Sequence, residues 1–175
     1  MTAVVRLRRA ETADVRRLWI WRNDPETRLA SLDGEEIPYD DHIQWFEGQL
    51  RSADAALFII EGGPEPIPCG QIRLSRLACC GAVISIGLAR ESRGRGLGVA
   101  ALKEIQRWPE RPPWANPIYA VIRLENDRSR RVFEAVGFVG PSEEGATLVG
   151  GVGKGVGVWV LRLQGSEPED DTILR

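Results

Sequence analysis

One stretch of the sequence restricts the fold more than any other: an apolar run that passes into a glycine-rich loop and then into a helix. Residues 82–88 are almost entirely apolar, as in a strand buried inside a sheet. Gly94, Gly96 and Gly98 follow, and a helix is predicted from about residue 96 to residue 108, where prolines end it. The first turn of such a helix presents unpaired N–H groups, which predicts an anion site.

The loop matches neither of the two best-known phosphate-binding patterns. Residues 93–98 read Arg-Gly-Arg-Gly-Leu-Gly, without the Gly-Lys-Ser/Thr of nucleoside triphosphatases. The spacing also departs from the Gly-x-Gly-x-x-Gly of dinucleotide-binding folds. Arg93 and Arg95 are predicted to add charge-assisted hydrogen bonds to a phosphate. The alternative is a structural turn whose arginines are solvated.

The remaining periodicity predicts one α+β domain with a mixed sheet. The predicted strands cover residues 3–7, 56–61, 69–77, 82–88, 118–124 and 156–163. The predicted helices cover residues 12–21, 40–50, 96–108 and 127–136, with a turn or a new helix start at Pro25. The order β-α-α-β-β-β-α-β-α-β lacks the strict alternation of a doubly wound fold. Because the connection over residues 137–157 is rich in glycine, we expect it to be mobile or bulged.

Composition and charge narrow the function classes. The 175 residues carry 23 basic and 25 acidic side chains, a net charge of −2, which argues against nucleic acid as a partner. His42 is the only histidine, and the three cysteines form neither a disulfide framework nor a zinc motif, so no metal is expected. No signal peptide or membrane span is recognisable, which predicts a cytoplasmic protein without membrane contact. The expected domain covers residues 1–164, and an acidic, disordered tail is expected at 165–175.

A second motif follows the strand predicted after the proline-rich segment. Asn126, Ser129 and Phe133 recur at three- and four-residue spacing and therefore share one face of a helix. Asn126 and Ser129 place short polar groups at the helix start, and Gly137 is expected to end the helix and return Phe138 to the core. On the residues alone, Asn126 could serve only as a cap and Ser129 as a surface residue.

Together the two motifs resemble those of the GNAT superfamily of acyl-CoA N-acyltransferases. The first is Arg-x-x-Gly-x-Gly, from Arg93 to Gly98, and the second is Asn-x-x-Ser-x-x-x-[Tyr/Phe]-x-x-x-Gly-Phe, from Asn126 to Phe138. Their order and the strands around them match as well, so the resemblance covers nearly the whole chain. It implies a largely antiparallel sheet, flanked by helices and splayed between the strands at 82–88 and 118–124, with acetyl-CoA in the splay.

The resemblance also implies which residues contact acetyl-CoA. Backbone groups at the end of the central strand would pair with the pantetheine arm, and the loop amides would hold the pyrophosphate. Asn126 and Ser129 would contact pantetheine or a phosphate, and Phe133 would lie near the thioester sulfur. The expected cofactor-binding residues are Leu88, Ala89, Arg90, Arg93, Gly94, Arg95, Gly96, Leu97, Gly98, Val99, Asn126, Ser129 and Phe133.

Acetyl transfer needs a neutral amine, a donor for the oxyanion and an acid for the departing thiolate. A backbone N–H near Leu88 is the expected oxyanion donor. Many members of the superfamily have a tyrosine acid where this chain has Phe133, which cannot donate a proton. The acid is therefore left open among Tyr39, Tyr119, Ser129 and water, or the thiolate leaves unassisted.

The general base is equally open. His42 is the candidate because only its side chain titrates near neutral pH without perturbation, although an exposed or capping role is the alternative. Ser85, on the central strand, is predicted to face either the cleft or the core. The candidate catalytic residues are His42, Ser85 and Tyr119.

The N-terminal third favours an amino-sugar acceptor. The segments Trp-Arg-Asn-Asp-Pro-x-x-Arg at 21–28, His-x-x-Trp-Phe at 42–46 and Gly-Gln-Ile-Arg at 70–73 are similar to one superfamily branch. That branch acetylates nucleotide-linked amino sugars on routes to nonulosonic acids such as pseudaminic acid. The implied substrate residues are Arg22, Asn23, Arg28 and Arg73. The alternative is that the tryptophans belong to the core and the arginines are solvated.

Three functions remain open at this point. The first is acetyl-CoA-dependent acetylation of a small primary amine. The second is acetylation of protein N-termini, since the Trp-Arg-Asn-Asp-Pro segment also resembles enzymes that acetylate ribosomal proteins. The third is a non-catalytic acyl-CoA binding module. The sequence is compatible with a homodimer but does not determine the oligomeric state.

Overall fold

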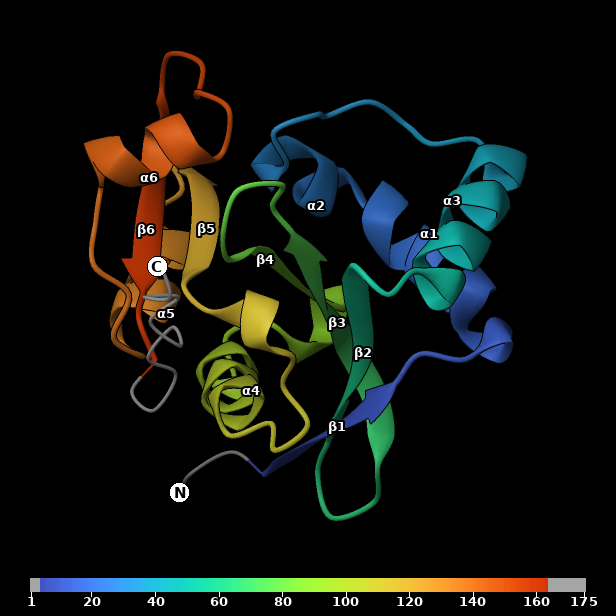
Figure 1. Ribbon diagram of the computed structural model, residues 1–175. Coiled ribbons are helices and arrows are strands. Elements are labelled where there is room, and N and C mark those ends of the chain that lie inside the picture. Colours follow the sequence, from blue (N-terminus) through green and yellow to red (C-terminus); the bar gives the residue numbers. More distant parts are fainter. Residues whose placement is uncertain (1–3, 164–175) are drawn as a thin grey trace, which may run out of the picture.

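The apolar run at residues 82–88 forms a strand inside a six-stranded sheet that has helices on both faces (Figure 1). The computed structural model describes residues 4–163, and the tail predicted at 165–175 lies outside them. The strands are β1 (Val5–Arg9), β2 (Ala55–Gly62), β3 (Ile67–Arg76), β4 (Ala82–Leu88), β5 (Ile118–Arg123) and β6 (Val156–Leu161). The helices are α1 (Val15–Asn23), α2 (Pro25–Ala30), α3 (Tyr39–Arg51), α4 (Leu97–Gln106), α5 (Asp127–Glu134) and α6 (Glu143–Leu148). Three 3-10 turns are η1 (Thr12–Asp14), η2 (Arg90–Ser92) and η3 (Pro113–Ala115).

The strands lie side by side in the order in which they occur along the chain. β4 and β5 are parallel, and every other neighbouring pair is antiparallel. This confirms the mixed, largely antiparallel sheet. The parallel pair is short, because pairing runs only from Ala82 opposite Ile118 to Ile84 opposite Ala120. Beyond those residues the two strands separate, as the splay predicted between them requires.

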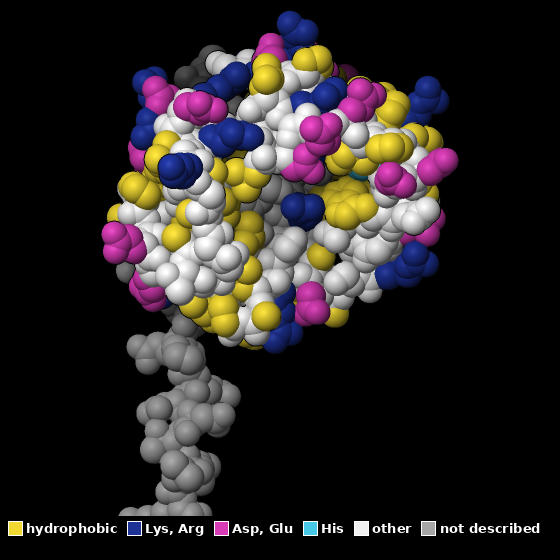
Figure 2. All heavy atoms as spheres, turned by 90° about the horizontal axis from the view of Figure 1, so that it is seen from above, with side chains coloured by type: hydrophobic (Ala, Val, Ile, Leu, Met, Phe, Trp, Pro, Cys, Tyr) yellow, Lys and Arg dark blue, Asp and Glu magenta, His cyan; other side chains and the backbone are white. Residues whose placement is uncertain are grey.

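The molecule is hollowed on the side seen from above in Figure 1. The hollow lies between the part that carries α6 and the part that carries α3 (Figure 2). A basic side chain and a hydrophobic patch lie next to each other inside it. Ser85 in the middle of β4 is exposed although β4 is an interior strand, so the helices leave this part of the sheet uncovered.

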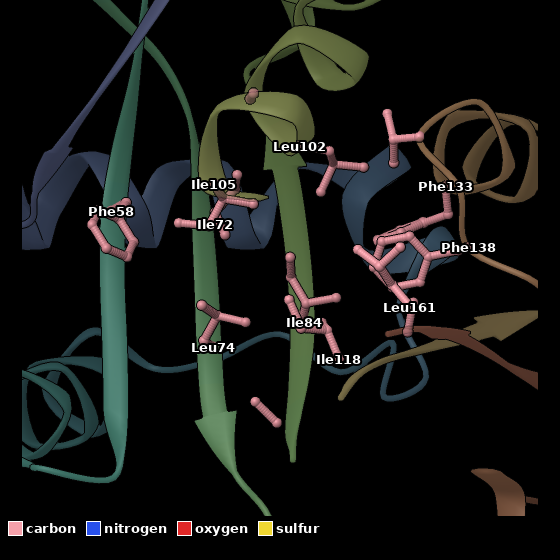
Figure 3. Packing of buried hydrophobic residues seen from close by; sticks show 14 of the residues in the cluster. Phe58, Ile72, Leu74, Ile84, Leu102, Ile105, Ile118, Phe133, Phe138 and Leu161 are labelled. Atoms are coloured by element: carbon pink, nitrogen blue, oxygen red, sulfur yellow. The ribbon is translucent and has the colours of Figure 1, made fainter. Parts of the chain in front are cut away.

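Successive side chains of a strand point to opposite faces of the sheet, and both faces of this sheet carry apolar side chains. On one face, Ile72, Leu74 and Ile84 pack against Leu102 and Ile105 of α4 (Figure 3). On the other face, a smaller cluster fills the space beneath α1 and α3. That cluster contains Ala10, Leu18, Phe46, Leu57 and Ile59. The two clusters fix the sheet between two helical layers.

The glycine-rich connection contains a helix that the sequence did not predict. Ser142 caps α6 by accepting a hydrogen bond of 3.0 Å from Gly145 N–H. A Cβ at Gly145 would lie 3.0 Å from a methyl carbon of Val158, so the absent side chain allows α6 to approach β6. The expectation of a mobile or bulged connection was therefore wrong for residues 143–148. The helix was not predicted because glycine usually indicates a loop. Gly145 instead lies inside the helix and allows it to pack closely on β6.

The predicted ends of the second-motif helix are confirmed. Asn126 is the N-cap, and its Oδ1 accepts a hydrogen bond of 3.0 Å from Ser129 N–H. At the other end, Phe138 N–H donates to Phe133 O and Gly137 N–H donates to Glu134 O. Gly137 has φ +95°, so these bonds form a Schellman cap. The cap turns the chain and returns Phe138 to the core.

Candidate active site

The separation of β4 from β5 leaves backbone groups of β4 without a strand partner on one side. Ala89 N–H donates 2.8 Å to Cys69 O, which precedes Gly70 on β3. Backbone groups of successive residues point to opposite sides of a strand, so the N–H of Leu88 points away from β3 and toward the gap. This orientation suits the oxyanion donor predicted near Leu88.

Ala89 and Arg90 are placed differently from Leu88. The N–H of Ala89 is already used in the bond to Cys69, and its side chain is buried. Arg90 begins η2, is exposed, and lies 3.6 Å from Glu26 across an ion pair. Backbone contacts with the pantetheine arm were predicted for Leu88, Ala89 and Arg90. Of these three residues, Leu88 has an N–H that points into the gap between β4 and β5.

The loop and the start of α4 have the backbone geometry that the predicted anion site requires. Gly94 has φ +75° and Gly96 φ +77°, conformations that other residues adopt only with strain. Gly96 is the N-cap of α4, and its carbonyl accepts the N–H of Ala100. The N–H groups in the first turn of α4, before Ala100, therefore lack partners within the helix. No acidic residue lies in that turn. The helix dipole adds positive potential at the same point.

The guanidinium of Arg93 is directed at α2 rather than at the mouth of the loop. It donates 2.8 Å to Asp24, the N-cap of α2, and 2.7 Å to Glu26. A third bond of 2.8 Å reaches Thr27 Oγ1, and Nε donates 3.1 Å to Leu88 O. The hydrogen bond from Arg93 holds the pKa of Asp24 below its usual range. Arg93 therefore joins the loop to α2, while Arg95 is exposed and open to a phosphate.

A matching contact joins α2 to the far side of the gap. Arg123, at the end of β5, donates 2.8 Å to Ser31 O and 3.1 Å to Leu32 O, directly after α2. Helix α2 is thus held at its start by the loop after β4 and at its end by β5. In Figure 3 it lies behind the space between β4 and α5. Neither contact was predicted, because contacts between segments far apart in the sequence leave no sign in the spacing of a motif.

Phe133 of the second motif is buried. Its ring is 3% exposed and packs edge to face on Phe138, with 4.9 Å between ring centroids (Figure 3). Asn126 and Ser129 are half-buried at the start of α5, where the side chain of Asn126 caps the helix. The cap accounts for Oδ1 of Asn126 and leaves its amide nitrogen as a donor for a ligand.

The three candidate catalytic side chains lie in different surroundings. His42 is 2% exposed, its Nε2 lies 3.1 Å from Val15 O, and burial lowers its pKa. Tyr119 is buried on the paired part of β5, 4.0 Å from Cys80 Sγ, and burial raises its pKa to about 12. Ser85 alone is exposed, next to the point where β4 and β5 separate. The structure brings Ser85 and Leu88 to the gap.

Two of the four predicted substrate residues organise the loop over residues 31–38. Asn23 donates 2.8 Å to Ile37 O and accepts 2.9 Å from Ile37 N–H. Arg28 donates 2.9 Å to Gly34 O and forms an exposed ion pair with Glu36. These contacts hold the loop against α1 and α2.

The other two, Arg22 and Arg73, form no ion pair with any carboxylate in the described part of the chain. Arg73 lies on β3 directly opposite Ser85 of β4, with its guanidinium carbon 5.4 Å from the centroid of the Trp45 ring. Arg22 donates 2.7 Å to Asp33 O. Burial lowers the pKa of Arg73, and the charge of Arg22 lowers it further. Arg73 therefore lies next to the exposed serine, and the charge of Arg22 acts on it.

Residues 4–163 contain neither a membrane-spanning helix nor a cluster of metal ligands. No helix there is long and apolar enough to cross a membrane. The same residues contain no group of three or more side chains that could hold a metal ion.

Comparison with known proteins gives one family and many similar folds. A family model described as an acetyltransferase (GNAT) domain matches residues 5–139. No curated protein matches the chain. A domain from Methanocaldococcus jannaschii has a TM-score of 0.75 at 18% identity, covering 92% of this chain and 99% of its own.

Two enzymes have similar structures. Spermidine N-acetyltransferase from Vibrio cholerae, solved with CoA and spermine, has a TM-score of 0.75 at 17% identity, covering 91% of this chain and 95% of its own. An acetyltransferase from Thermus thermophilus has a TM-score of 0.69 at 18% identity, covering 93% and 98%. At these identities the similarity shows the fold.

Proposed function

Because the chain belongs to the acetyltransferase (GNAT) domain family, we propose that it transfers the acetyl group of acetyl-CoA to a primary amine of a small molecule. The observation that carries this proposal is the gap between β4 and β5, which opens beside the unpaired amides at the start of α4. An unpaired strand edge offers backbone hydrogen bonds to the amides of the pantetheine arm, and the helix start next to it offers an anion site for the pyrophosphate. In this chain the unpaired edge of β4 and the anion site at the start of α4 follow each other along the sequence.

The loop residues would hold acetyl-CoA mainly through their backbone. The amides between Gly94 and Val99 bind the pyrophosphate, and Arg95 adds a charge-assisted bond from the exposed side. Leu88 pairs with the pantetheine arm or the thioester oxygen. Arg93 positions the loop through α2 and does not itself contact phosphate.

Transfer then follows from groups near the gap. The neutral amine attacks the thioester carbonyl carbon, and the N–H of Leu88 stabilises the oxyanion. The C–N bond forms, the C–S bond breaks, and CoA leaves as a thiolate. The amine proton passes to water. The thiolate takes a proton from water, either directly or relayed through the exposed hydroxyl of Ser85, which regains its own proton from water. Phe133 cannot supply that proton.

We propose nucleotide-linked amino sugars as the first acceptors to test, on the similarity of the segments at 21–28, 42–46 and 70–73. Acetylation of a protein N-terminus is the competing activity, and a peptide substrate distinguishes it. Spermine is the compound found in the Vibrio cholerae structure, so polyamines belong in the same panel.

Calorimetry with acetyl-CoA, ADP and ATP tests the proposal. Acetyl-CoA should bind more tightly than ADP, since the unpaired edge of β4 recognises the arm that ADP lacks. Equal affinities would contradict the proposal. Replacing Gly96 by valine should abolish binding, because a β-branched residue is strained at φ +77°. The matched control is Gly48→Ala on α3, where a Cβ meets nothing within 4 Å. Thiol release across the amine panel then identifies the acceptor.

A further inference from the structure

Arg22 and Arg73 are two cations that the fold leaves uncompensated. Neither forms an ion pair with an acidic side chain of residues 4–163, and Nη1 of Arg22 is buried without a hydrogen-bond partner there. The only contact found for the Arg73 guanidinium within that range is the face of Trp45. Both residues are half-buried. Half-burying a guanidinium without a counter-ion is costly, and such groups cluster at functional sites.

The position of Arg73 connects this pair to the reaction. Arg73 is the cross-strand neighbour of Ser85, and both side chains lie on the same face of the sheet. Leu57, the neighbour of Arg73 on the other side, belongs to the cluster under α1 and α3. Arg73 therefore lies where the cover of α1 and α3 ends and the uncovered part of β4 begins. Figure 2 shows a hollow on this side, with a basic side chain beside a hydrophobic patch.

We propose that Arg73 and Arg22 bind an anionic group, a carboxylate or a phosphate, on the molecule whose amine is acetylated. The planar guanidinium of Arg73 offers a two-pronged donor to such a group, and Nη1 of Arg22 supplies a further donor. Trp45 forms an apolar wall against the stem of the acceptor. Polyamines are excluded, because an additional cation would meet two unpaired guanidinium groups. The inference rests on the proposed acetyl transfer and specifies its substrate class.

Matched acceptor pairs test this inference in the full-length protein. The carboxylate arm compares 4-aminobutyrate with butylamine, the phosphate arm compares glucosamine 6-phosphate with glucosamine, and spermidine represents polyamines. The anionic member of at least one pair should have a kcat/KM about 10- to 100-fold higher than its neutral partner. A preference for the anionic amine in the carboxylate arm identifies the bound group as a carboxylate, and a preference in the phosphate arm identifies it as a phosphate. Equal values within both pairs, or preference for spermidine, would overturn the proposal.

Variants of Arg73 locate the preference. Arg73→Gln should remove it by raising the KM for the anionic acceptor far more than the KM for its neutral partner or for acetyl-CoA. Arg73→Lys should restore part of it, because the charge returns without the planar fork. Arg76→Gln is the matched control, since Arg76 lies on the same strand but is exposed and paired with Asp54. An equal loss for neutral and anionic amines in Arg73→Gln contradicts the assignment.

Binding of inorganic phosphate separates this inference from the proposed function. If no amine releases thiol from acetyl-CoA, the proposed transfer fails, whatever the outcome at Arg73. Phosphate titrated into wild-type protein and into Arg73→Gln still decides the anion site, because any binding at the α4 loop is common to both. Weaker binding to the variant supports the site, and identical isotherms reject it.

Discussion

Arg93 of the loop after β4 donates a hydrogen bond of 2.8 Å to Asp24, the residue that caps α2. The two side chains are only 14% and 15% exposed, so the pair is largely shielded from water. One contact therefore joins the proposed cofactor loop to the helix that lies beside the acceptor side.

Replacing Arg93 by glutamine should destabilise the protein and weaken both binding steps. The change leaves Asp24 partly buried without its cation, which costs about 3 kcal/mol in comparable buried pairs. Urea unfolding measures the stability, and KM values for acetyl-CoA and the acceptor measure the two steps. Arg51→Gln, which removes an exposed pair with Glu47, should change stability by less than about 0.5 kcal/mol. If Arg93→Gln raises only the KM for acetyl-CoA, its side chain binds phosphate directly.

The same pair should make the protein sensitive to acid. Because the bond from Arg93 lowers the pKa of Asp24 in the fold, its contribution is complete above the unfolded pKa, near 4. It is lost as the pH falls through the folded pKa. Unfolding free energies from pH 6 to pH 2 should therefore decrease less steeply in Asp24→Asn than in wild type. Asp54→Asn, at an exposed pair, serves as the control, and parallel curves for Asp24→Asn and wild type contradict the prediction.

His42 should affect stability near neutral pH rather than catalysis. Burial lowers its pKa, so the folded protein keeps the imidazole neutral at a pH where the unfolded chain binds a proton. This contribution is complete above the unfolded pKa near 6.5 and is lost as the pH falls below it. His42→Gln should therefore flatten the stability curve between pH 5 and pH 7 while leaving the shape of the kcat/KM profile unchanged. Loss of the acidic limb of that profile, the fall of kcat/KM at low pH, would instead identify His42 as the base.

Introducing tyrosine at position 133 should not create the missing acid. Phe133 is buried against Phe138, so the new hydroxyl would enter an apolar core at a cost of about 1–3 kcal/mol. We expect lower stability and no increase in kcat for Phe133→Tyr. Phe138→Tyr in the same cluster is the control, with a similar loss of stability expected. A higher kcat in Phe133→Tyr alone would show that position 133 reaches the thioester.

Ser85 offers the complementary test of proton transfer. Ser85→Ala should lower kcat if its exposed hydroxyl assists the departing thiolate, with an expected decrease of about 10- to 100-fold. Stability should hardly change, because the side chain is exposed. Pre-steady-state thiol release measures the step directly. An unchanged rate assigns the proton to water.

The sequence alone determined those parts of the protein that depend on neighbours along the chain. Four features follow from contacts within a few residues of the chain. They are the strand at 82–88, the left-handed Gly96 before α4, the Asn126 cap and the Gly137 turn. Such local preferences are visible as residue spacing and glycine placement. The family resemblance rests on the same two segments, and for that reason it extended to the order of the strands.

Only the tertiary structure decided the partners of the arginines. Arg93 and Asp24 are 69 positions apart, and Arg123 lies 92 positions from Ser31, so spacing carries no sign of either contact. Nothing in the residue pattern distinguishes Arg28, which holds a loop, from Arg73, which pairs with no carboxylate between residues 4 and 163. A guanidinium can bind a ligand or support the fold, and which it does depends on the groups that packing brings within hydrogen-bond distance.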